Sequence, residues 1–262
     1  MCYFKSIIRD VQDEWLGHFA LLVAPHGTFT DEGQKAFEKV VAHNDISEGS
    51  AEIPKRVDGQ KTFYVLDPGG DLTDTQNRLS KMLQQYVFWK GIVGQPPKPE
   101  ELRQYLQNND FFLYMGHGSG GRYFGKSVIR NSDCRAVSLL MGCSSARILH
   151  EGDGFDGQSV IYDYSIARCP CLVGCLWMVT DGEIDRFLMA LVKHCFSNST
   201  GDFGESYRLL IDAVAYARTA CRLRYMTGGA VVSYGLPIVA RNIVAFCNNG
   251  NIVPQLPEPA NC

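Results

Sequence analysis

The stretch that decides the fold is FFLYMGHGSGGRYF, residues 111–124. Its five leading apolar residues, Phe111 to Met115, predict a fully buried strand. The strand then ends on Gly116, His117 and Gly118. A histidine that only packs in a core has no need of neighbouring glycines, whereas glycines beside a reactive histidine let a substrate backbone approach closely. This strand end is therefore a candidate site.

A second strand ends in the same style. CRAVSLLMGCSS, residues 134–145, is an apolar run that finishes on Gly142, Cys143 and Ser144. The separation from His117 to Cys143 is 143 − 117 = 26 residues. A loop and helix of that length let two parallel strands lie side by side with adjacent ends. Reactive groups of open α/β sheets gather at the carboxyl ends of the strands, so we expect an imidazole beside a thiol.

The fold class follows from strands that alternate with helices. Strands are predicted within 15–25, 61–71, 111–115, 134–145, 169–179 and 230–241, and helices within 30–45, 71–86, 99–108, 159–167, 181–196 and 201–225. Because the strands are nearly all apolar, they are expected to form a mostly parallel sheet with helices on both faces. The sequence thus predicts an α/β fold of three layers.

Composition excludes several classes of protein. The chain has 262 residues, 45% of them hydrophobic, and a net charge of −3, which does not favour binding to nucleic acid or an anionic membrane. No apolar run reaches the ~18 residues of a membrane span. The N-terminal stretch MCYFKSIIRDVQDEW does not have the layout of a signal peptide, so we expect a cytosolic or nuclear protein.

The ten cysteines do not indicate a disulfide framework in a chain of this length without an export signal. Cys169, Cys171 and Cys175 lie in an apolar run, their spacing does not fit a zinc site, and no histidine cluster accompanies them. We interpret them as buried free thiols and expect no metal or other cofactor.

A thiol beside an imidazole has a recognisable chemistry. The thiolate is the nucleophile, and an imidazole takes the thiol proton and later protonates a leaving amine. The backbone N–H groups of Gly118 and Cys143 are candidates for stabilising an oxyanion. The alternatives are that His117 is a loop residue and that Cys143 only packs at a strand end. One His and one Cys make a metal site a weaker interpretation.

With these residues the sequence resembles the separase family, the caspase-like cysteine proteases that open cohesin rings at anaphase. The matching segments occur in a fixed order and cover roughly residues 15–240: WLGHFALLVAP, VLDPGGDLTDTQ, GIVGQPPKPEELRQYLQNNDFFLYMGHGSGGRYF, CRAVSLLMGCSSA, FDGQSVIYDYSIARCPCLVGCLWMVTDGEIDRF and VVSYGLPIV. The resemblance implies a caspase-like fold, with His117 as general base and acid and Cys143 as nucleophile. It also implies cleavage after arginine in an acidic Glu-x-x-Arg context.

An arginine pocket needs a carboxylate, because a desolvated guanidinium requires a planar acceptor. Asp181 is the candidate, with Asp185 and Asp156 as further possibilities. Asp181 has the alternative role of capping the helix that follows it. Trp177 either lines the pocket or belongs to the core. Met178 stands where many relatives have an acidic residue, and the loop after Cys143 is longer than expected.

The resemblance also suggests boundaries and partners. We expect an N-terminal part at 1–110, similar to a pseudo-protease or substrate-associated subdomain, an active caspase-like subdomain at 111–245 and a tail at 246–262. The implied substrate is the kleisin subunit of cohesin, and the implied partners are a securin-type inhibitor and the helical-repeat region of a longer separase chain, in cytoplasm and nucleus. The alternative function is a catalytically silent caspase-like module that binds an extended partner segment.

Overall fold

The computed structural model describes residues 55–149, 158–196, 206–242, 247–248 and 251–252. Their centre is a six-stranded sheet in the order β3-β2-β4-β5-β6-β8. The strands are β2 (Thr62–Leu66), β3 (Lys90–Val93), β4 (Phe111–Met115), β5 (Val137–Leu140), β6 (Cys171–Cys175) and β8 (Val231–Gly235). All neighbours pair in parallel except β6 and β8, which are antiparallel. The predicted mostly parallel sheet is confirmed.

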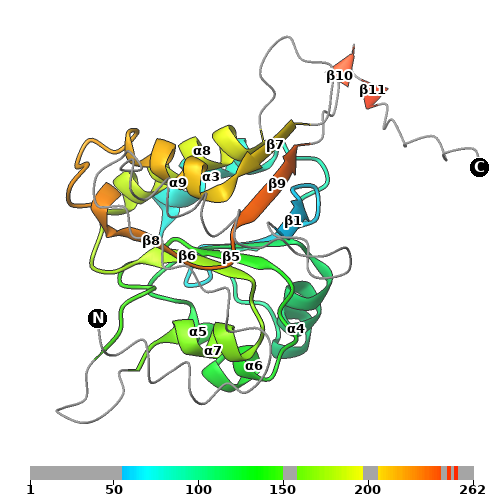
Figure 1. Ribbon diagram of the computed structural model, residues 1–262, viewed down its shortest axis with the longest axis vertical. Coiled ribbons are helices and arrows are strands. Elements are labelled where there is room, and N and C mark those ends of the chain that lie inside the picture. Colours follow the sequence, from blue (N-terminus) through cyan, green and yellow to red (C-terminus); the bar gives the residue numbers. More distant parts are fainter. Residues whose placement is uncertain (1–54, 150–157, 197–205, 243–246, 249–250, 253–262) are drawn as a thin grey trace, which may run out of the picture.

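Helices cover both faces of this sheet (Figure 1). On one side lie α3 (Thr73–Leu83), α8 (Asp181–Phe196) and α9 (Leu210–Arg218). On the other lie α4 (Pro99–Asn108), α5 (Gly121–Phe124), α6 (Lys126–Arg130) and α7 (Val160–Ile166). The three predicted layers are therefore present.

Strand β4 shows why its sequence is apolar throughout. Phe111, Leu113 and Met115 belong to the core under α3 and α8, whereas Phe112 and Tyr114 belong to the core under α4 and α7. Alternate side chains of a strand point to opposite faces, so a strand covered on both sides needs an apolar residue at every position. All five are buried.

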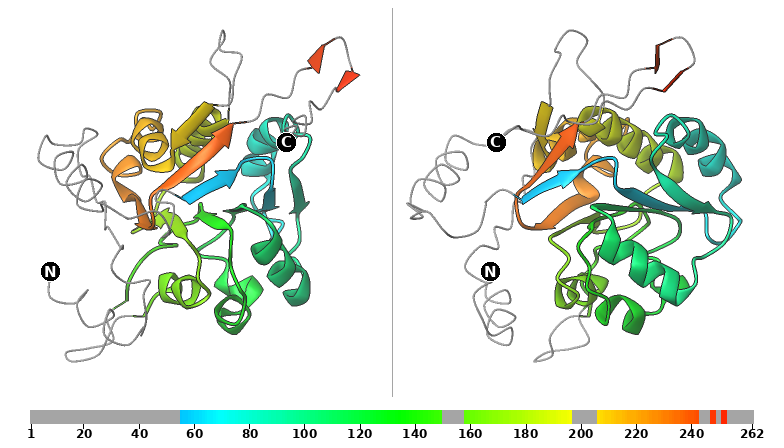
Figure 2. Two further views of the ribbon diagram at one scale, coloured as in Figure 1. Left: turned by 45° about the vertical axis from the view of Figure 1, so that its right-hand side comes forward. Right: turned by 90° about the vertical axis from the view of Figure 1, so that its right-hand side faces the viewer.

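A second, smaller sheet joins distant parts of the chain. Its order is β1-β9-β7, made by β1 (Lys55–Asp58), β9 (Ile238–Asn242) and β7 (Ser206–Leu209). Figure 2 shows β1 beside β9, although β1 is the first strand of the described residues and β9 one of the last. A short hairpin of β10 (Cys247–Asn248) and β11 (Asn251–Ile252) follows.

One sequence-based expectation needs correction. A single long helix within 201–225 is wrong, because β7 pairs with β9 and α9 covers only Leu210–Arg218; sheet pairing overrides the helical periodicity there. The expected boundary at 110/111 falls between residues of one sheet. Strands β2 and β4 pair along five positions across it, so the residues on the two sides share one core.

Some predicted features lie outside the described residues: the strand at 15–25, the helix at 30–45, Asp156 and most of the tail at 246–262. Within the part of the chain that the structure describes, no helix is both long and apolar enough to cross a membrane.

Candidate active site

The ends of β4 and β5 meet at one edge of the sheet. The two strands are parallel, with Tyr114 opposite Leu140, so the residues that follow leave the sheet together. Contact between them is close. A Cβ added at Gly142 would lie 2.4 Å from the carbonyl oxygen of Gly116 and 2.0 Å from that of Gly118. The backbone just before Cys143 therefore packs against the backbone on both sides of His117.

His117 is held by its main chain and leaves its ring accessible. The Tyr114 hydroxyl donates a 2.6 Å hydrogen bond to the His117 carbonyl oxygen. Burial raises the pKa of Tyr114, so this donor keeps its proton. The imidazole is 43% exposed, and its Nε2 lies 3.1 Å from Oδ1 of Asp71.

Asp71 comes from the turn after β2, the strand next to β4. In that turn Asp67 has a φ of 50° and is buried. Its N–H donates to the carbonyl oxygen of Met115 at 2.7 Å, and its Oδ1 accepts the N–H of Asp71 at 3.1 Å. The turn thus fixes Asp71 relative to the end of β4. Sequence reasoning identified this turn but did not assign Asp71 to the site.

Cys143 is partly exposed, and its thiol meets the segment between β6 and α8. The Sγ donates to the Val179 carbonyl oxygen at 3.0 Å, and the Val179 N–H points at the sulfur at 3.4 Å. The next residue, Ser144, has a φ of 55° and donates its N–H to the Trp177 carbonyl oxygen at 3.0 Å. The nucleophile candidate is thereby set on a tight turn above the sheet.

Ser145 ties this turn to the two central strands. Its buried hydroxyl donates to the Leu140 carbonyl oxygen at 2.6 Å and accepts the Cys175 N–H at 2.9 Å. The hydroxyl, two residues after Cys143, therefore bridges the ends of β5 and β6, which limits how far the thiol-bearing turn can shift.

Both candidate oxyanion donors are available. Neither the Gly118 N–H nor the Cys143 N–H donates a hydrogen bond to any described group. Gly118 has a φ of 61°, and a Cβ there would meet nothing within 4 Å. Two backbone donors beside an open space are what an acyl-transfer site needs for the charge that develops on a carbonyl oxygen.

Asp181 begins α8 on the surface. Its carboxylate forms no hydrogen bond or ion pair with the described part of the chain. The Thr180 carbonyl oxygen accepts the N–H groups of Glu183 and Ile184, both at 3.0 Å, so Thr180 holds the cap position. Asp181 is therefore free to bind a cation that arrives from solvent.

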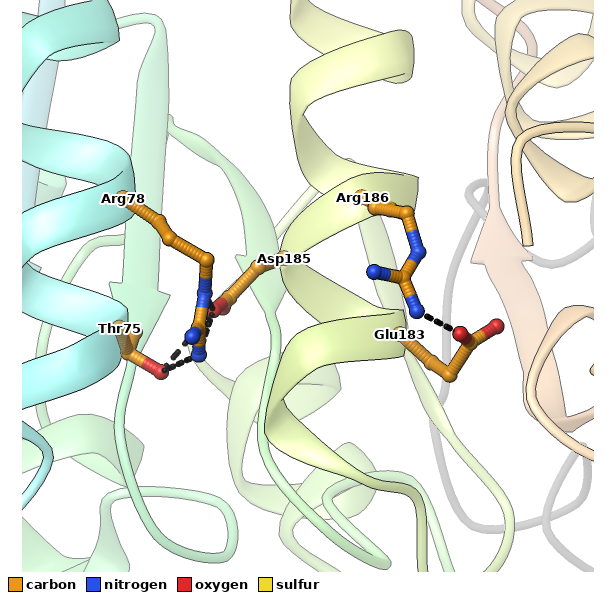
Figure 3. A network of polar contacts seen from close by, with 5 residues as sticks. All are labelled: Thr75, Arg78, Glu183, Asp185 and Arg186. Carbon is orange, nitrogen blue, oxygen red and sulfur yellow. Dashed lines mark hydrogen bonds and ion pairs between the residues drawn. The ribbon is translucent and has the colours of Figure 1, made fainter. Parts of the chain in front are cut away.

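Asp185 is already engaged. Its buried carboxylate accepts hydrogen bonds from Arg78 Nε at 2.7 Å and from the Thr75 hydroxyl at 3.0 Å, and so joins α8 to α3 (Figure 3). Burial raises the pKa of Asp185 even though Arg78 opposes that shift. This carboxylate is already paired with Arg78 of its own chain, so it is not available to a substrate arginine.

Trp177 is not a core residue. It is 43% exposed, and its indole Nε1–H donates to the Met226 carbonyl oxygen at 2.7 Å. The segment 222–226 is exposed at every residue. Trp177 thus lies between the turn that carries Cys143 and this surface segment, at a position suited to contact an extended ligand.

Glu183 was not singled out by sequence reasoning. Its buried carboxylate accepts the Leu223 N–H at 2.9 Å and pairs with Arg186, which is drawn in Figure 3. It therefore anchors the exposed 222–226 segment to the first turn of α8, beside Asp181. The sequence around Glu183 shows a helix start and apolar spacing, and neither feature indicates a hydrogen-bond partner 40 residues away.

Six other cysteines are buried, namely Cys134, Cys169, Cys171, Cys175, Cys195 and Cys221. Burial raises the pKa of Cys171, Cys175 and Cys195 to about 12 in each case. These thiols stay protonated near neutral pH and are poor nucleophiles. Among the described residues, no group of three or more His, Cys, Asp or Glu side chains is arranged to hold a metal ion.

Comparisons with known proteins identify a family. Residues 38–184 match the family model described as the protease domain of separin. Separin of Mus musculus is 39% identical over 190 residues, which are 72% of this chain and 9% of that protein. Separin of Saccharomyces cerevisiae is 37% identical over 179 residues, 66% of this chain and 11% of that protein. The chain thus spans about a tenth of the length of these curated relatives.

A solved structure is also similar. A chain in the crystal structure of the Saccharomyces cerevisiae separase–securin complex aligns with a TM-score of 0.65 and 33% sequence identity. The alignment covers 72% of this chain and 13% of that one. A second crystal structure of the same complex aligns with a TM-score of 0.63 and 34% identity.

Proposed function

This chain belongs to the separin protease-domain family, a family of cysteine proteases, and from that premise we propose that it cleaves peptide bonds after arginine with Cys143 as nucleophile and His117 as general base and acid. The observation that carries the proposal is the backbone contact of Gly142 with Gly116 and Gly118, which brings the two strand ends together.

In the proposed first half-reaction, the imidazole of His117 takes the proton of the Cys143 thiol, and the sulfur attacks the scissile carbonyl carbon. The negative charge that forms on the carbonyl oxygen is met by the N–H groups of Gly118 and Cys143. The C–N bond then breaks, and the imidazolium gives its proton to the leaving amine. The products of this step are a free amine and a thioester on Cys143.

In the second half-reaction, His117 takes a proton from water, and the hydroxide attacks the thioester carbon. The C–S bond breaks, the new carboxyl product leaves, and the thiol is restored with the proton held by His117. Before the first attack, the Sγ must give up its hydrogen bond to the Val179 carbonyl oxygen. Substrate binding at the Val179 segment supplies that change.

Selection of arginine is proposed to come from Asp181. Its carboxylate is exposed, lacks a partner within the described chain and follows Val179 by two residues. An unpaired carboxylate that follows the thiol-contacting residue Val179 suits a guanidinium, which donates two parallel N–H bonds to the oxygens of a carboxylate. The indole of Trp177 provides an apolar surface for the methylene groups of the arginine.

A fluorogenic peptide that ends in arginine tests this function. We expect the full chain to release the fluorophore, and we expect Cys143→Ser and His117→Ala each to abolish the release. Cys134→Ser, a change at a buried thiol before β5 and therefore at the opposite end of that strand from Cys143, serves as the matched control and keeps activity. Tight binding without cleavage would instead support the catalytically silent module, and cleavage without arginine preference would support a different caspase-like hydrolase.

For the natural protein, we propose that the substrate is the kleisin subunit of cohesin, cut to allow chromosome segregation, and that a securin-type inhibitor and a helical-repeat region are its partners. The support is the similarity to relatives named separin and to a chain solved in a separase–securin complex. Residence in cytoplasm and nucleus is part of this proposal. Incubation of the protein with a purified kleisin, followed by sequencing of the new N-termini, tests it.

A further inference from the structure

We propose that Asp71 is the positioning residue for the histidine: its carboxylate holds the Nε2–H of His117, so that Nδ1 is the ring nitrogen that serves Cys143. This inference rests on the proposed function and names a residue of the same site. The Oδ1 of Asp71 lies 3.1 Å from Nε2 of His117. No other described side chain forms an ion pair with Asp71.

The position of Asp71 is built into the turn after β2. The buried residue Asp67 takes a left-handed conformation, donates its N–H to the carbonyl oxygen of Met115 and accepts the N–H of Asp71. Met115 is the last residue of β4, and His117 follows two residues later. The Asp71 carboxylate and the His117 imidazole are thus both positioned by the end of β4.

A local structural role does not account for Asp71. It precedes α3, but the cap position of that helix is Leu72, and no side chain caps the helix there. Its carboxylate is 62% exposed and faces the imidazole rather than a buried donor. The main effect of the Asp71 carboxylate is therefore on which nitrogen of the His117 ring carries a proton.

That consequence is a choice of tautomer. A neutral imidazole carries one proton, and the nitrogen opposite to it is the base. A carboxylate that accepts from Nε2–H leaves the lone pair on Nδ1. After His117 takes the thiol proton, the same carboxylate stabilises the imidazolium, as the third member of other catalytic triads does. Asp71 touches neither substrate nor sulfur in this scheme and acts through His117.

The test compares Asp71→Asn and Asp71→Ala with Asp74→Asn, an exposed carboxylate of α3 that forms no ion pair with the described residues. With the arginine peptide we expect both Asp71 variants to lower kcat about tenfold to a hundredfold, a part of the total effect of general base catalysis, with KM within about twofold. Asp74→Asn should match the wild type. Unchanged kcat in both Asp71 variants would overturn the inference.

A spectroscopic readout separates ring positioning from mere stability. In protein labelled with ¹⁵N-histidine, His117→Ala identifies the resonances of His117. We expect the neutral ring to carry its proton on Nε2 in the wild type and to be a mixture of tautomers in Asp71→Asn. A wild-type ring protonated on Nδ1 would contradict the inference, even if an Asp71 variant failed to fold.

Failure of the proposed function would look different. If Cys143→Ala retains turnover of the arginine peptide, the assignment of the nucleophile is wrong, whatever the Asp71 variants do. If Cys143→Ala and His117→Ala abolish turnover while Asp71→Asn and Asp71→Ala leave kcat unchanged, the function stands and the inference about Asp71 fails.

Discussion

Gly142 and Gly118 touch through their backbones, so closely that a Cβ on Gly142 would lie 2.0 Å from the carbonyl oxygen of Gly118. The clashing atom is a backbone carbonyl oxygen, which cannot move aside by changing rotamer as a side-chain atom can. This contact joins the residue before the thiol to the residue after the imidazole. The geometry of the proposed dyad therefore requires a glycine at position 142.

Gly142→Ala should consequently lower kcat/KM about a hundredfold or more, because a displacement of about 1 Å between reacting groups is enough for such a loss. Gly182→Ala is the matched control. A Cβ at Gly182, in the first turn of α8, would meet nothing within 4 Å, so activity should persist. Initial rates, normalised to the folded fraction seen by circular dichroism, provide the measurement. Equal rates for the two variants would show that the strand ends need not touch.

Reactivity should distinguish Cys143 from the other thiols. An irreversible electrophile with arginine at its tip is expected to label Cys143 and none of the other nine cysteines, since Cys143 is partly exposed at the strand end while burial raises the pKa of Cys171, Cys175 and Cys195 to about 12. Peptide mapping by mass spectrometry locates the adduct. A matched reagent with a neutral tip controls for general thiol reactivity, and an arginine-dependent adduct at another cysteine would refute the assignment.

The sequence predicted those features that depend on local pattern. The apolar run Phe111–Met115 predicted a buried strand, and the bounds of β4 agree with that prediction. The helix predicted at 99–108 is observed at Pro99–Asn108, with the proline at its start and Leu102 and Leu106 buried. The two strand ends were visible because glycines flank His117 in one and a glycine precedes Cys143 in the other, and glycine lets a substrate backbone approach closely.

What the sequence did not predict depends on partners far along the chain. Asp71 is 46 residues from His117, and Asp185 is 107 residues from Arg78. Neither pairing leaves a periodic pattern, so Asp71 was missed and Asp185 was considered for a substrate arginine. The segment Ser206–Leu209 has helical spacing but pairs with β9, a strand that local pattern cannot place beside it.

Asp181→Ala should weaken arginine selection and leave folding unchanged. The carboxylate is exposed and Thr180 holds the cap position, so removal should cost the folded state less than about 0.5 kcal/mol. The ratio of kcat/KM for arginine over an uncharged residue should fall at least tenfold, because a guanidinium then loses its charged acceptor. Asp133→Asn, an exposed residue before β5 at the opposite edge of the sheet, is the control. An unfolded Asp181→Ala protein would favour a structural role.

Arg78→Met should destabilise the fold because it leaves the buried carboxylate of Asp185 without its charged partner. Asp185 is 4% exposed at its side chain, and Arg78 is 36% exposed. We expect a loss of about 2 to 3 kcal/mol in the free energy of unfolding, less than the about 3 to 5 kcal/mol of a fully buried pair because the guanidinium is partly in water. Denaturant unfolding measures the loss, and Arg103→Met, on the exposed side of α4, should change it by less than about 0.5 kcal/mol.

The double variant Arg78→Met/Asp185→Asn decides whether charge is the cause. Burial already raises the pKa of Asp185, and without Arg78 it should rise further. When the pKa of a carboxyl group is higher in the folded than in the unfolded state, the protein becomes less stable as the pH rises from the unfolded pKa to the folded one. The deficit of Arg78→Met should therefore be larger at about pH 7 than at about pH 5, and Asp185→Asn should remove this pH dependence and restore part of the stability. A deficit that is the same at both pH values and in the double variant would mean that Arg78 acts through the packing of its methylene groups.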